Sequence, residues 1–117
     1  VSVIVTDNVA QAYNQLRPFL ALYIGGMGAK GKNFYNDLAV RYGYGDAAAK
    51  IQDLYLAGRQ GEAMMAVPDA LIVEVALVGS RERIAERLAA WQACDITTLN
   101  VSCWNVGSLR TMVELVG

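Results

Sequence analysis

The sequence has 117 residues, enough for one domain with one core. Apolar residues make up 55% and charged residues 18%, and the formal net charge of −1 gives no basic footprint for nucleic acid. The chain has no histidine, which removes the commonest general base and the commonest metal ligand. No apolar run reaches the ~18 residues that a membrane helix needs, and because "VSVIVTDN" lacks a basic region and a cleavage site we do not expect it to be a signal peptide.

The two cysteines, Cys94 and Cys103, do not have the spacing of a metal site. We expect them to be small buried hydrophobic residues in a reducing, cytoplasmic protein. Because the chain begins at Val1 rather than at a methionine, we also expect a piece of a longer protein.

The first elements in chain order are a strand and a long helix. The β-branched run at residues 1–5 is typical of a buried strand. Residues 6–8 offer a helix N-cap, with Asp7 favoured, so a helix is expected from about Val9. Pro18 falls inside the helical pattern, where it should kink the helix or end one helix and begin another.

Several shorter helices are expected next. A glycine-rich segment at residues 25–31 interrupts the pattern, and a short helix follows that Gly43 ends. Asp46 is the expected cap of a further helix, which stops at Gly58. After a helical turn at residues 59–67, the segment 69–79 is ambiguous between helix and strand, and Pro68-Asp69 favours helix for its first half.

The clearest helix spans residues 80–94. Ser80 is its expected cap, and Leu88 and Trp91 are expected to be buried against a sheet while Arg83 and Arg87 stay largely exposed. A second strand is expected at "ITTLNV", residues 96–101, and a last helix at residues 108–116. The long crossover between the two strands predicts parallel pairing, and therefore an α/β fold.

The segment "YIGGMGAKGKNF" satisfies two phosphate-binding patterns. Gly26 to Gly31 reads as G-x-G-x-x-G, and Gly26 with Gly31, Lys32 and Asn33 reads as a P-loop in which Asn replaces Ser or Thr. Both patterns need a strand before the glycines, whereas "PFLALYI" continues a helical face. Asn33 cannot supply the hydroxyl that binds Mg²⁺ in a P-loop, and Asp53, at the Rossmann spacing, lies in a predicted helix. We therefore interpret the glycines mainly as a helix end and a tight loop.

Two long stretches carry a resemblance to a known family: "RPFLALYIGGMGAKGKNFYNDLAVRYGY" and "VPDALIVEVALVGSRERIAERLAAWQACDITTLNV". The chain resembles the C-terminal part of luciferase-like flavin oxidoreductases, and it looks most like the subgroup that uses the deazaflavin coenzyme F420. The most specific parts are the block from Arg17 to Tyr35, the turn at residues 68–71, and the Val-Gly pair before Ser80.

The resemblance implies a fold and an extent. It implies the C-terminal portion of a (β/α)8 TIM barrel, with residues 1–5 as strand seven and 96–101 as strand eight. Residues 8–79 would then be the intervening helix with a helical insertion. A whole barrel takes ~250 residues, so we expect residues 1–117 to be a C-terminal fragment of such a domain.

The resemblance also implies an activity. The parent would transfer a hydride between coenzyme F420, or alternatively FMN, and a small organic substrate, while the isolated fragment would be inactive. The alternative is a non-catalytic structural fragment that self-associates or completes a barrel with its missing half. Neither nucleic acid nor a membrane is an expected partner.

The barrel that the resemblance implies indicates where site residues would lie. None of the family's acid/base residues matches a position in this chain, so no catalytic residue is assigned, and no metal site is expected. Side chains after the two strands could face an active site; these are Thr6, Asp7, Ser102, Cys103 and Trp104. For each of these residues a structural role is the stronger explanation: Asp7 as a helix cap and Trp104 as packing over the barrel end.

The cofactor contacts expected within this chain are Gly26, Met27, Gly28 and Ser102, lining the barrel mouth, while most cofactor contacts lie outside it. Two positions depart from the family pattern. Cys94-Asp95 replaces Ala-Gly, which would place Cys94 in a left-handed conformation, and Asn100 interrupts the second strand, where it would need buried hydrogen-bond partners.

Overall fold

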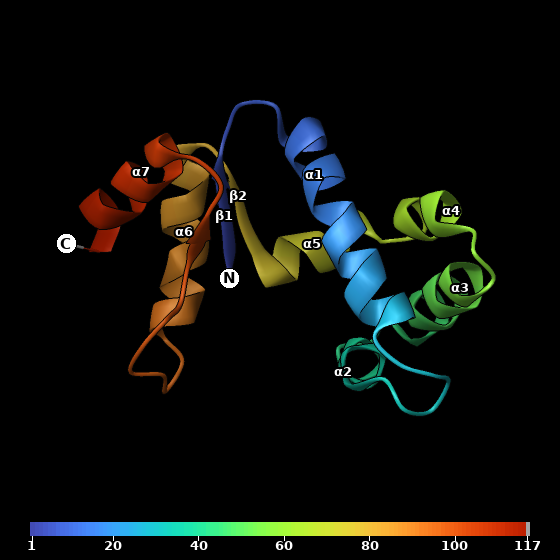
Figure 1. Cartoon of the computed structure of the whole chain (residues 1–117). Helices are drawn as coiled ribbons and strands as arrows, with labels where there is room; N and C mark the ends of the chain where they lie inside the picture. The colour runs from blue at the N-terminus through green and yellow to red at the C-terminus, as the bar shows by residue number, and fades with distance from the viewer. Residues whose placement is uncertain (117) are drawn as a thin grey trace. The chain divides into compact units, whose positions relative to one another are not determined.

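A computed structural model describes residues 1–116 and divides the chain into two compact units (Figure 1). One unit unites Val1–Tyr13 with the chain from Val73 onward, and the other comprises Asn14–Ile72. The elements in chain order are β1 (Ser2–Val5), α1 (Val9–Ala21), the π-helical turn η1 (Leu22–Gly26), α2 (Phe34–Arg41), α3 (Gly45–Leu56), α4 (Gln60–Met65), α5 (Asp69–Val75), β2 (Ala76–Gly79), α6 (Arg81–Gln92), β3 (Ser102–Cys103) and α7 (Val106–Val116).

The sheet has three parallel strands in the order β2-β1-β3. Ser2 of β1 lies opposite Ala76 of β2 on one side and Ser102 of β3 on the other. The predicted first strand and the parallel pairing are confirmed. The predicted second strand is wrong, because residues 96–101 form a loop and the strands lie at 76–79 and 102–103 instead.

The strand order determines how far the predicted fold class is confirmed. In a barrel wound in one direction each new strand joins the preceding one, whereas β3 here lies beside β1 rather than β2. The described residues therefore show an α/β unit with a small parallel sheet, and the barrel belongs to the proposal below.

The segment 69–79 changes from helix to strand in its middle. The structure confirms helix for the first half, as α5, and continues directly into β2. All four residues of β2 are buried, as expected for a parallel strand that is covered on both faces.

α6 and α7 pack on one face of the sheet (Figure 1). The core there is one apolar cluster, formed by Val3, Leu77, Ile84, Leu88 and Met112. The Ser80 side chain caps α6 by accepting a hydrogen bond from the Arg83 backbone N–H at 3.2 Å, as predicted.

The two arginines of α6 differ in exposure. Arg83 is exposed, but the prediction for Arg87 is wrong: its guanidinium is half-buried and donates to the Val73 carbonyl at 2.8 Å. Leu88 is buried and Trp91 is partly buried against the same cluster. An arginine can bury its stem and still reach a carbonyl, which the helical pattern alone does not reveal.

Two predicted caps need correction. α1 is capped by Asn8, whose side chain accepts from the Gln11 N–H at 3.2 Å, while Asp7 is exposed. Asp46 lies inside the first turn of α3, after an N-cap at Tyr44, where its charge still favours the helix dipole. Pro18 lies inside α1 and does not end it.

The glycine stops are confirmed, and two local expectations are not. Gly43 and Gly58 take positive φ angles of 95° and 81° after α2 and α3. Within residues 1–116 no residue other than glycine has positive φ, so Cys94 is not left-handed; it is also exposed. Asn100 is exposed and carries no burial cost.

In the unit Asn14–Ile72, α2 and α3 pack against η1, and α4 packs against α3 (Figure 1). Its buried apolar residues include Leu16, Ala21, Ile24, Ile51, Val67, Leu71 and Ile72. Arg17 fixes the chain ahead of α5, since its guanidinium donates to the Val67 carbonyl and pairs with the Asp69 carboxylate.

Candidate functional site

The glycine segment follows a helix, as the sequence predicts. α1 passes directly into η1, which ends at Gly26, so the glycines stand at a helix C-terminus. A phosphate loop instead presents the N–H groups of a helix N-terminus. Both nucleotide patterns therefore lack their required geometry.

The glycines are needed for close packing. A Cβ on Gly25 would stand 2.7 Å from the Cβ of Tyr55, and one on Gly26 would stand 2.5 Å from the Tyr55 ring. A Cβ on Gly28 would stand 2.4 Å from the Lys32 carbonyl oxygen. The space beside these glycines is thus filled by the protein itself rather than left for a phosphate.

Asn33 ties the segment together. It is 1% exposed, and its Nδ2 donates to the carbonyls of Tyr23 and Ile24, each at 3.0 Å. Its Oδ1 accepts from the Asn36 N–H at 3.0 Å and so caps α2. The residue that breaks the P-loop pattern therefore joins the end of η1 to the start of α2.

Asn36 extends this connection to α3. Its Nδ2 donates to the Ile24 carbonyl at 3.0 Å and to the Ala48 carbonyl at 2.9 Å. The Tyr23 and Ile24 carbonyls lie at the C-terminal end of η1, where carbonyls have no partner within the helix, and the two asparagines satisfy them. η1, α2 and α3 are thus held as one framework around the loop.

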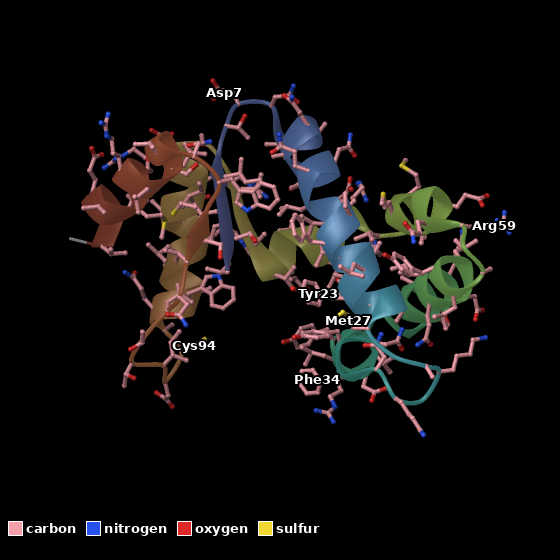
Figure 2. All side chains as sticks on the ribbon, in the orientation of Figure 1. Asp7, Tyr23, Met27, Phe34, Arg59 and Cys94 are labelled. Carbon is pink, nitrogen blue, oxygen red and sulfur yellow. The ribbon has the colours of Figure 1, made fainter. Side chains whose placement is uncertain are left out.

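An exposed group of aromatic and apolar side chains lies on this framework, and Figure 2 shows three of its members, Tyr23, Met27 and Phe34, near the end of α1. The rings of Tyr23 and Tyr35 are 4.8 Å apart, and those of Phe34 and Tyr35 are 5.4 Å apart. We call this group the aromatic surface. It consists of Tyr23, Met27, Phe34 and Tyr35, which are between 38% and 66% exposed. Such a surface is suited to contact with another apolar surface or a flat ring.

The strand-end candidates have mostly structural contacts. The Thr6 N–H donates to the Gly79 carbonyl at 2.9 Å, and its hydroxyl accepts from the Asn8 N–H at 3.0 Å. Ser102 and Cys103 form β3 rather than following it, and Ser102 is exposed. Trp104 comes directly after this strand.

The four predicted cofactor contacts divide between the units. Gly26, Met27 and Gly28 share one turn, and Met27 is 49% exposed. Ser102 belongs to the other unit, so its place beside them stays a prediction.

One exposed ion pair shifts two pKa values. Arg59 Nη2 donates to Glu62 Oε1 at 2.6 Å at the start of α4. This hydrogen bond, together with the opposite charge, lowers the pKa of Glu62 and raises that of Arg59. The pair supports the first turn of α4 rather than any chemistry.

Other kinds of site are absent from the described part of the chain. Residues 1–116 contain no cluster of three or more His, Cys, Asp or Glu side chains that could hold a metal ion. None of the helices within these residues has the length and apolar character needed to cross a membrane.

The sequence model of the family described as luciferase-like monooxygenase matches residues 1–98. The chain belongs to this family. It is also 35% identical over 114 residues to a protein of Mycobacterium tuberculosis (strain ATCC 25618 / H37Rv) named "putative coenzyme F420-dependent oxidoreductase". The match covers 97% of this chain and 33% of that protein, so the chain spans about a third of its relative's length. No solved structure matches the chain.

Sequence reasoning missed the residues that hold the framework, Asn33, Asn36 and Tyr55. The segment "KNFYND" did contain a signal, because an Asn before a helical run is a good N-cap. Nothing in the sequence indicated that Tyr55 would fill the space beside Gly25 and Gly26, since that contact joins segments about 30 residues apart.

Proposed function

We propose that the chain is the C-terminal part of a (β/α)8 oxidoreductase that transfers a hydride between coenzyme F420, or FMN, and an organic substrate. The observation that carries the proposal is membership of the luciferase-like family together with 35% identity to the mycobacterial relative. The 33% coverage of that relative is what a fragment would give. The name of that relative supports F420 ahead of FMN.

The close packing of the glycines limits the contacts that this chain would make with a cofactor. Gly26 and Gly28 are packed against Tyr55 and Lys32, so they offer a ring no open space. Met27 and the rest of the aromatic surface are exposed and could form an apolar wall that excludes water from a reacting centre. The cofactor supplies the hydride chemistry, and most of its contacts would come from the missing part of the parent.

Binding measurements on two polypeptides test the proposal. The 117-residue chain and the longer polypeptide encoded by its gene are titrated with F420 and, separately, with FMN, using the cofactor's own fluorescence. We expect saturable binding by the longer polypeptide and none at micromolar concentration by the chain alone. A parent that binds neither cofactor would overturn the oxidoreductase assignment, and tight binding by the chain alone would overturn the fragment assignment.

A second candidate, a structural fragment that associates with copies of itself, is favoured by α7. Four residues of this helix at helical spacing form an apolar stripe that is between 49% and 64% exposed: Val106, Leu109, Val113 and Val116. Large exposed apolar patches mark interaction sites or aggregation hazards.

Size exclusion with light scattering distinguishes the candidates. If the stripe drives association, the chain exceeds its monomer mass of 12.6 kDa at micromolar concentration. Val113→Lys should then shift the chain toward monomer, while Ala90→Lys on the exposed face of α6 should not. A monodisperse monomer with a sharp unfolding transition would exclude this second candidate.

A further inference from the structure

The aromatic surface forms one continuous apolar patch. Ring contacts join Tyr35 to Tyr23 and to Phe34, and Met27 is the C-cap of η1, four residues after Tyr23. A side chain of this size presents ~150–250 Å² when fully accessible, so at their observed exposures the four leave roughly 400 Å² open. Single exposed apolar side chains are ordinary on a protein surface, whereas a continuous patch of this size marks a site of contact.

The patch is held in place before any contact is made. Tyr23 belongs to η1, and Phe34 and Tyr35 belong to α2. Asn33 joins these two elements, since its Nδ2 donates to the Tyr23 carbonyl at 3.0 Å and its Oδ1 accepts from the Asn36 N–H at 3.0 Å. A preformed surface loses less conformational entropy when a partner docks onto it.

The directions of the rings favour a protein surface over a flat ring as the partner. The planes of Tyr23 and Tyr35 meet at 56°, and those of Phe34 and Tyr35 meet at 84°. A flat ring stacks on one plane at a time, so these three rings do not form a platform for it. The side chains of a folded partner point in different directions and can fill such an uneven surface.

The size of the patch favours a partner that belongs to the same polypeptide. Two separate chains that form a stable interface each bury ~800 Å², about twice the area of the patch. A segment of the same polypeptide keeps no independent translational freedom to lose on docking, so a smaller contact suffices. The chain covers 33% of its mycobacterial relative, so about two-thirds of that protein lies outside the match.

We propose that the aromatic surface docks onto an apolar face of the remainder of the parent polypeptide, an inference that rests on the fragment part of the proposed function. The occupant is protein of the same polypeptide rather than a cofactor ring or a second copy. Phe34, at 66% the most exposed of the four side chains, is the expected anchor of the contact. Docking closes the apolar wall with protein on both sides, which keeps water away from it.

Methionine oxidation by hydrogen peroxide, measured by mass spectrometry after digestion, tests the proposal. Met27 is 49% exposed, and Met65, on α4 outside the aromatic surface, is 74% exposed. If docking lowers the exposure of Met27 to about a tenth, Met27 should oxidise roughly fivefold more slowly in the longer polypeptide encoded by the gene than in the 117-residue chain. Met65 should react alike in both, and Met112, at 3% exposed, should stay protected in both and so reports folding.

A pair of variants assigns the protection to this contact. Phe34→Asp places a charge in the apolar contact and should restore most of the Met27 oxidation rate in the longer polypeptide. Phe34 is the first residue of α2, where an acid suits the helix dipole, so the 117-residue chain should tolerate the change. Gln60→Asp introduces the same charge at the exposed first residue of α4 and should leave the protection of Met27 unchanged.

Several results would overturn the proposal. It fails if Met27 reacts at the same rate in both polypeptides, if Met65 is protected equally, or if the protection requires added F420 or FMN. Protection already present in the 117-residue chain, or protection that grows with protein concentration, would assign a different occupant and also overturn it. A longer polypeptide that binds a cofactor but leaves Met27 exposed refutes this inference alone, whereas one that protects Met27 and binds neither cofactor refutes only the oxidoreductase assignment.

Discussion

Replacing Asn33 gives the sharpest test of how the glycine segment is held. Asn33→Ala removes the α2 cap, worth ~1 kcal/mol. It also removes two donor bonds of 3.0 Å, to the carbonyls of Tyr23 and Ile24. The Ile24 carbonyl still accepts a hydrogen bond from the Asn36 side chain, whereas the Tyr23 carbonyl loses its hydrogen bond from Asn33. A lost hydrogen bond costs ~0.5–1.5 kcal/mol and an unsatisfied buried carbonyl ~1–3 kcal/mol, so together with the cap the total loss should be ~2.5–5.5 kcal/mol.

Two further variants separate the roles of the side chain. Asn33→Ser can still cap α2 and should recover ~1 kcal/mol of the loss. Asn33→Asp keeps the capping oxygen but turns a second oxygen, with negative charge, toward two carbonyls. Because the site is 1% exposed, this variant should be less stable than Asn33→Ala. It also tests which end of the amide faces the carbonyls.

The assay is urea unfolding followed by circular dichroism at one fixed protein concentration, because association changes apparent stability. The slope of free energy against urea should stay constant across the variants, so that the midpoints report stability alone. Asn100→Ala, at an exposed loop position, is the control and should fall within ~0.5 kcal/mol of the unmodified chain. The reasoning is refuted if Asn33→Asp is as stable as the unmodified chain, or if Asn33→Ala matches the control.

Four further outcomes are expected. Leu88→Ala should cost ~2–5 kcal/mol in urea unfolding, whereas an exposed substitution on the same helix should stay within ~0.5 kcal/mol. Gly25→Ala should destabilise the chain through its contact with Tyr55, while Gly61→Ala, which meets nothing within 4 Å, should be neutral or stabilising. NMR titration should show that the pKa of Glu62 rises when its arginine partner is replaced by alanine. Because the folded-state pKa of Glu62 is lowered, its contribution to stability is present above the unfolded pKa and is lost as pH falls through the folded value. ATP with Mg²⁺ should give no saturable heat in calorimetry, and micromolar binding would contradict the helix-end interpretation.

Much of the secondary structure could be predicted because the signals are local. Ser80 before an amphipathic run, and Gly43 and Gly58 after others, mark helix ends through backbone geometry that each residue controls itself. The switch from α5 to β2 was only half predicted. "ALVG" becomes a strand because β1 pairs with it across about 70 residues, a contact that composition does not encode.

The predicted strand at residues 96–101 was wrong for a related reason. Its Thr-rich and apolar residues suit a strand, but in this structure only Ser102 and Cys103 reach β1. Strand propensity describes a residue's fit to a half-buried sheet surface, so the outcome depends on whether a partner strand is available. The candidate site was limited in the same way, because its predicted residues lie in two units of the chain and local sequence signals do not report contacts between distant segments.

The balance of backbone donors and acceptors explains why the glycine segment imitates a nucleotide motif without being one. A phosphate loop has surplus N–H groups, because the first four N–H groups of the helix after it have no partner within the helix. The segment from Tyr23 to Gly28 contains the C-terminal end of η1, so its surplus groups are carbonyl oxygens. Carbonyls attract donors, and here the amides of Asn33 and Asn36 supply them. An anion placed at this point would face carbonyl oxygen atoms. A glycine pattern of this kind therefore indicates a phosphate site only when it is known whether a strand or a helix precedes it.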